Sequence, residues 1–141
     1  MTGAPRIPGL NLNDADWLAQ TALAVGADRG FAPLAVATVD VTGAVIALRR
    51  SDGAAPMTSR IAVAKARSAL VSLRPSGELD KVPPGITAAV QALYRGDFVA
   101  RAGGVLVTDG DLVVGAAGAS GAASEEDEEA VRTAVERWQA R

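Results

Sequence analysis

The chain has 141 residues, of which 49% are hydrophobic and only 4% aromatic, and its 14 basic and 16 acidic side chains leave a formal net charge of -2. This length predicts one domain with a single core of Ala, Val and Leu, and the small charge excludes a field that attracts nucleic acid or an anionic membrane, so we expect neither partner. The chain has no cysteine and no histidine, which excludes disulfides, thiolate metal sites and the usual acid, base and metal ligand near neutral pH, so no metal site is predicted.

The N-terminal part predicts a lead-in followed by a helix. Residues 1–11 contain Pro5 and Pro8 and predict a flexible segment, and residues 12–141 predict a single domain. Asn13 is a candidate N-cap for an amphipathic helix that ends near Gly30. The chain shows neither a secretory signal nor an apolar run of membrane-spanning length, and we expect a cytoplasmic protein.

The middle of the chain predicts a hairpin, a helix and an irregular segment. Two short apolar runs on either side of Thr42-Gly43 predict an antiparallel hairpin. Apolar residues at helical spacing predict a helix over residues 56–73. Prolines and glycines interrupt residues 74–101, where we expect a short helix at 86–94 and allow a fifth strand at 97–101.

The C-terminal part predicts a second hairpin and a last helix. Residues 103–121 read as two strands around Asp109-Gly110, with more glycine than a strand usually tolerates. Ser124, acidic residues and an apolar stripe then predict the final helix. Antiparallel hairpins alternating with helices predict an α+β domain.

Four blocks in this order resemble the GlcG/HbpS-like or haem-degrading-domain family, which is related to the C-terminal domain of PduO-type proteins. The blocks are Val39–Gly43, Arg50–Gly53, Ala64–Ala66, and the glycine-rich ending from Gly103 to Glu128. The resemblance covers about residues 12–139 and implies a five-stranded antiparallel sheet flanked by helices in profilin-like layers. It also implies homo-oligomers and the binding of haem or another small molecule. Leu106 replaces the proline of the family's G-G-V-P turn.

The glycines of the second hairpin have two readings. Gly115, Gly118 and Gly121 are explained by the close approach of a helix or a neighbouring subunit to the sheet. For Gly103 and Gly104 we hypothesise that bare backbone N–H groups bind a ligand, with Ser120 lining the same mouth.

Charged residues supply the remaining candidates. Asp52 either accepts hydrogen bonds from its own turn or forms the rim of a pocket, where Arg50 clamps an acidic ligand. Lys65 lies among apolar helix neighbours, so it either snorkels or is a partly buried amine that pairs with a carboxylate or acts as a base. The resemblance also implies a lysine here, which favours a site role. Glu126 belongs to an acidic run that either favours the helix dipole or moves a proton.

Tyr94, the only tyrosine, either anchors a short helix by its ring or binds a ligand, as a ferric haem ligand or a proton donor. Met57 is the other candidate axial ligand, although a methionine at a helix start is more often part of a core.

Three functions compete at this stage. The first is a homo-oligomer that binds a small molecule near Gly103-Gly104, with cofactor unknown and without histidine-ligated haem, because no histidine exists to ligate iron. The alternative is a cofactor-independent isomerase, cyclase or lyase in which Asp52 or Glu126 moves a proton while Lys65 or Arg50 stabilises an oxyanion. The third is a structural subunit whose glycines serve assembly alone.

Overall fold

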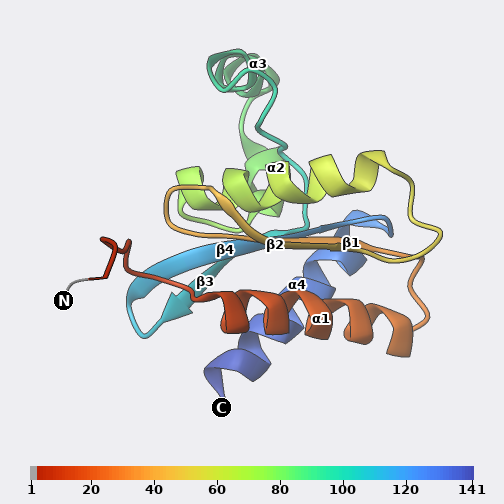
Figure 1. The fold of residues 1–141 in the computed structure, drawn as a ribbon. Helices are drawn as coiled ribbons and strands as arrows, with labels where there is room; N and C mark the ends of the chain where they lie inside the picture. Colours follow the sequence, from red (N-terminus) through yellow and green to blue (C-terminus); the bar gives the residue numbers. More distant parts are fainter. Residues whose placement is uncertain (1–2) are drawn as a thin grey trace.

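The protein is described here by a computed structural model that covers residues 3–141. Its elements in chain order are α1 (Leu12–Asp28), β1 (Ala35–Val39), β2 (Val45–Arg50), α2 (Met57–Ser72), the 3-10 helix η1 (Ser76–Lys81), α3 (Pro84–Leu93), β3 (Gly104–Asp109), β4 (Leu112–Ser120) and α4 (Ser124–Gln139). The strands form one antiparallel sheet in the order β2-β1-β4-β3. Figure 1 shows α2 on one face of this sheet and α1 and α4 on the other.

The expected α+β class with an antiparallel sheet flanked by helices is confirmed, but the expected fifth strand is wrong for the part of the chain described. The sheet there has four strands, and residues 97–101 are irregular. Side chains replace a strand partner in this segment: the Val99 N–H donates to Ser68 Oγ at 2.7 Å, and the Arg101 carbonyl accepts from Ser76 Oγ at 2.6 Å. Because these backbone groups are already hydrogen-bonded to side chains of α2 and η1, they do not have to pair with a neighbouring strand.

The four α-helices and both hairpins lie close to where the sequence places them, whereas η1 forms in the segment 74–101 that is expected to be irregular apart from one short helix. The N-cap of α1 also differs, because it is Asn11 and not Asn13. The Asn11 side chain accepts from the Asp14 N–H at 2.8 Å and so starts α1 two residues earlier.

The sheet face towards α1 and α4 buries the larger side chains. Strand residues alternate between the two faces, and this face receives Val36, Val105 and Val107. Leu18 of α1 and Trp138 of α4 pack against them. This layer is an ordinary hydrophobic core.

The opposite face is built from small residues, on which α2 packs closely. Ala35 and Ala37 of β1 contact Ala62 of α2. Gly118 of β4 lies against the α2 backbone, where an added Cβ would collide with the Ala62 carbonyl oxygen. The prediction that Gly118 admits a close helix is therefore confirmed.

Helix α3 lies apart from both layers. None of its residues is buried, and Figure 1 shows it beyond α2, on the side away from the sheet. The connections on either side of α3 meet at Ser76 of η1, whose Oγ donates to the Arg101 carbonyl and accepts from the Gly104 N–H.

Candidate functional site

One end of the sheet gathers four of the predicted ligand-binding residues. Ala35 at the start of β1 pairs with Arg50 at the end of β2 and with Ser120 at the end of β4. The Ala119 N–H donates to the Gly103 carbonyl at 2.8 Å, and Gly104 begins β3 beside it. The antiparallel order thus places Arg50, Ser120, Gly103 and Gly104 at the same end of the sheet, with Arg50 and Gly104 on opposite edge strands.

A buried ion pair lies at this end of the sheet. Lys65 Nζ of α2 lies 3.0 Å from Asp127 Oδ2 of α4, and the two side chains are only 4% and 3% exposed. The other carboxylate oxygen, Asp127 Oδ1, accepts from the Ala122 N–H at 2.9 Å. The pair therefore joins helices that cover opposite faces of the sheet.

The electrostatics of this pair are set by burial. Burial raises the pKa of the Asp127 carboxyl, and the Ala122 N–H and the Lys65 ammonium oppose this rise without cancelling it. Removing either partner leaves an uncompensated charge or polar group in the interior. Perturbed carboxyls of this kind are common at functional sites and are also found in structural ion pairs.

The Gly103-Gly104 turn lies directly against Lys65. At Gly103, whose φ is +137°, an added Cβ would lie 2.7 Å from Lys65 Cδ and 2.8 Å from Lys65 Nζ. The Gly104 N–H donates to Ser76 Oγ at 2.8 Å, so the protein itself satisfies it. The absence of side chains at the turn leaves room for the lysine and the α2 backbone, and a ligand-binding role of the two glycines stays a prediction.

A hollow of about 600 Å³ opens beside this turn. It lies between η1, α3, the segment before β3 and the first turn of α4, and we call it the turn hollow. Its lining residues are Leu79, Asp80, Val82, Pro84, Thr87, Gln91, Ala100, Arg101, Ala102, Ser124 and Glu125. The mixture of hydroxyl, amide, guanidinium and carboxyl groups suits a polar organic molecule.

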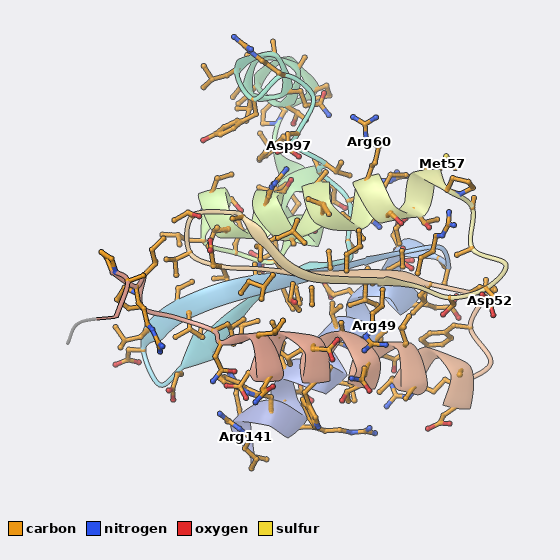
Figure 2. All side chains as sticks on the ribbon, viewed as in Figure 1. Arg49, Asp52, Met57, Arg60, Asp97 and Arg141 are labelled. Atoms are coloured by element: carbon orange, nitrogen blue, oxygen red, sulfur yellow. The ribbon has the colours of Figure 1, made fainter. Side chains whose placement is uncertain are left out.

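The remaining predicted site residues lie elsewhere. Asp52 is exposed in the loop between β2 and α2 (Figure 2) and lines a small hollow with Phe31 and Pro33. Glu126 accepts from the Ala123 N–H at 3.2 Å and closes the start of α4. Tyr94 stacks on Phe98 with ring centroids 6.1 Å apart. The structure thus brings Lys65 to Gly103 and places Glu126 next to Asp127 in the first turn of α4, whereas Asp52 and Tyr94 lie apart from the ion pair.

Asp127 is the residue that sequence reasoning missed. It lies in the acidic run at the start of α4, which reads as a solvated helix terminus. Its spacing to Ala130, Val131 and Ala134, which are all buried, places it on the apolar face of the helix. That spacing is the signal that distinguishes Asp127 from its acidic neighbours.

Within residues 3–141, no cluster of three or more His, Cys, Asp or Glu side chains is arranged to hold a metal ion. In the same residues, no helix combines the length and the apolar character that crossing a bilayer requires.

Comparison with known proteins gives one family and several similar structures. The family model of the haem-degrading protein HbpS-like group matches residues 10–136. No curated protein matches the chain. Protein ORFY of Klebsiella pneumoniae has a TM-score of 0.87 at 23% identity, with 100% of this chain and 98% of that chain covered, and this likeness concerns the fold.

Two further crystal structures are similar in fold and somewhat closer in sequence. The PduOC:haem complex has a TM-score of 0.82 at 26% identity and covers 91% of this chain and 94% of its own. HbpS has a TM-score of 0.81 at 27% identity and covers 95% of this chain and 93% of its own.

Proposed function

The chain belongs to the HbpS-like family of haem-degrading proteins, and from this premise we propose that it binds a small organic molecule in the turn hollow and works as a homo-oligomer. The observation that carries the proposal is the turn hollow itself. Its volume of about 600 Å³ lies in the usual range for ligand pockets. Its wall carries the guanidinium of Arg101 and the carboxylates of Asp80 and Glu125, which offer charged hydrogen bonds to a polar molecule.

The buried ion pair supports a ligand at this place. The first turn of α4 carries Ser124 and Glu125, which line the hollow, and Asp127, which holds Lys65. Because these residues share one helical turn, the ion pair fixes the wall that a ligand would contact. A fixed wall lowers the ordering cost of binding.

Haem is the ligand that the PduOC relative contains, and its iron needs protein ligands of a particular kind. The chain has neither histidine nor cysteine. Its tyrosine and its Met57 do not line the turn hollow. Histidine, cysteine, methionine and tyrosine are the usual protein ligands of haem iron, so the residues at this hollow do not fit haem. We propose an organic ligand held by polar side chains instead.

Filling the hollow tests this function. Thr87 lines the hollow, whereas its neighbour Ala88 on α3 is exposed and does not. We expect native mass spectrometry of freshly purified protein, or a thermal-shift screen of small metabolites, to reveal a ligand for the wild type and for Ala88→Trp. Thr87→Trp should lose at least tenfold in affinity for it. Equal binding by both variants, or no ligand for the wild type, would contradict the proposal.

Helix α3 supports the homo-oligomer. It carries no charged residue and none of its residues is buried, and Ile86 and Leu93 are 55% and 77% exposed. Exposed apolar surface of this kind is typical of protein contacts. Native mass spectrometry reports the subunit count, and Ile86→Glu with Leu93→Glu should lower it.

The acid–base enzyme is the second candidate, and the raised pKa of Asp127 is the observation that favours it. Lys65 and Asp127 would then be the proton-transferring groups, and a substrate would have to reach them past the Gly103-Gly104 turn. Incubating the purified protein with its bound molecule and analysing the mixture by mass spectrometry separates the two functions. Conversion by the wild type and not by the double variant Lys65→Met with Asp127→Leu, shown to be folded by circular dichroism, supports catalysis, and an unchanged molecule supports binding alone.

A further inference from the structure

A second hollow lies on the edge of the molecule formed by β2. It has a volume of about 670 Å³ and shares none of its lining residues with the turn hollow. Strand β2, helix α2 and the segment after α3 surround it. Its apolar lining consists of Val45, Leu48, Ile61, Val63, Ala64 and Val99.

Three arginines line this hollow together with the apolar residues, which we call its floor, and we call the site the arginine hollow. Arg60 and Arg67 come from α2, and Arg95 comes from the turn after α3. The one carboxylate in the lining is Asp97, which gives three positive charges against one negative charge, or +2. Figure 2 shows Arg60 and Asp97 on the same side of α2, away from the sheet.

The three arginines differ in whether they form an ion pair within the protein. Arg67 is fixed, because it contacts Asp97 Oδ2 at 3.0 Å and donates to the Gly43 carbonyl at 2.8 Å. Arg60 and Arg95 form no ion pair with any residue in the range 3–141. Two guanidinium groups therefore remain available to an anion.

The turn that carries Arg95 is held in a specific conformation. Arg95 has a φ of +56° and Gly96 a φ of +81°, both in the left-handed region. The Gly96 N–H donates to the Gln91 carbonyl at 2.8 Å, and the Asp97 N–H donates to the Tyr94 carbonyl at 3.0 Å. A left-handed conformation is unfavourable for a non-glycine residue, and this one brings Arg95 and Asp97 to the same hollow.

The apolar floor of the arginine hollow is exposed to solvent because, among residues 3–141, β2 has no neighbouring strand on its outer side. β2 is an edge strand, and its Val45 and Leu48 side chains are 42% and 43% exposed. An apolar body that covers these side chains would remove them from water, while the arginines bind its charge.

We propose that the arginine hollow binds an organic anion with a compact apolar body, such as an aromatic or branched carboxylate or sulfonate. The charge of +2 over an apolar floor selects this class against neutral apolar molecules and against inorganic anions. The site is separate from the turn hollow and does not depend on the function proposed for it.

Two fluorescent probes separate the charge from the apolar body. The probe 8-anilinonaphthalene-1-sulfonate has a negatively charged sulfonate group. N-phenyl-1-naphthylamine has nearly the same aromatic body and no charge. We expect Arg60→Gln with Arg95→Gln to raise the Kd of the sulfonate probe at least tenfold and to change that of the neutral probe less than twofold. Arg6→Gln with Arg137→Gln removes the same charge from exposed positions outside the hollow and should leave both Kd values unchanged.

Further variants locate the bound probe. Leu48→Ser should weaken the binding of both probes, because it removes part of the floor, and Thr87→Trp should weaken neither. Circular dichroism and thermal melting confirm that each variant is folded. The proposal is overturned if the two arginine pairs have equal effects on the sulfonate probe. It is also overturned if the Arg60/Arg95 variant changes the subunit count in native mass spectrometry, since the hollow would then be a contact between copies of the chain.

Discussion

The two faces of the sheet are packed in different ways although the same strands supply both. On the face towards α1 and α4, Val36, Val107 and Trp138 fill the space with side chains. On the face towards α2, alanine and glycine bring backbone against backbone. The first face is packed by larger side chains, whereas the larger side chains in the clusters of the second are Val39, Val63 and Leu70.

The close packing on the α2 face also sets the position of Lys65. The Lys65 carbonyl oxygen occupies the place where a Cβ of Gly104 would be. The close approach of α2 therefore determines where the Lys65 side chain meets Asp127. A backbone contact holds a side chain in place more firmly than interlocking side chains do, because it lacks rotamers.

The largest expected effect comes from breaking the buried ion pair. Lys65→Met leaves the Asp127 carboxylate without its cation in the interior and should cost about 3–5 kcal/mol of unfolding free energy. Urea unfolding followed by circular dichroism measures the loss. The double variant Lys65→Met with Asp127→Leu should recover much of it, because no charge is then left buried. A double variant as unstable as the single one would show that the loss comes from packing.

A smaller effect is expected from one methyl group on the α2 face. Gly118→Ala forces α2 away from β4 and should cost about 1–3 kcal/mol of unfolding free energy. Gly85→Ala is the matched control, because an added Cβ there meets nothing within 4 Å, and it should be neutral or stabilise by up to about 1 kcal/mol. If the two variants had equal stability, the backbone contact would not be as close as described.

The smallest effect concerns two carboxyls, those of Asp40 and Asp127, whose pKa values are shifted in opposite directions. Burial tends to raise the pKa of Asp40, but hydrogen bonds from the Thr42 hydroxyl and from the Thr42 and Ala44 N–H groups outweigh it and lower this pKa below 3.8. For Asp127, burial raises the pKa above 3.8.

These shifts give opposite dependences of stability on pH. The contribution of Asp40 is present above pH 3.8 and is lost as pH falls through its folded pKa. The contribution of Asp127 is present below pH 3.8 and is lost as pH rises through its folded pKa. Carboxyl ¹³C chemical shifts between pH 2 and 7 measure both values. An Asp127 that titrates below Asp40 would contradict the assignment.

Sequence reasoning predicts the four α-helices and both hairpins. It misses η1, expects a strand at residues 97–101 where the backbone is irregular, and misses one site residue. Periodicity and turn dipeptides locate the helices and hairpins, because these signals are local. The backbone of residues 97–101 bonds to the side chains of Ser68 and Ser76, which lie far away in the chain. No local pattern carries that information, so a strand was expected.

The candidate site likewise contains residues that the sequence singles out and residues that it does not. The apolar helix neighbours of Lys65 predict either a snorkelling side chain or a partly buried amine, and the structure shows the buried amine. Its site role is implied by the family resemblance alone, and sequence reasoning does not separate Asp127 from the acidic run around it. Which acidic residue turns inward depends on where α4 meets the sheet, and this is decided by tertiary packing. The hollows are made by elements distant in the chain, so their lining could not be assembled from the sequence.

The Asp127 carboxylate bonds at once to Lys65 of α2 and to the Ala122 N–H just before α4. It therefore links the two helical layers that cover opposite faces of the sheet. Any displacement of the first turn of α4 has to pull on α2 or release the lysine, and the outer layers are thereby constrained to shift together.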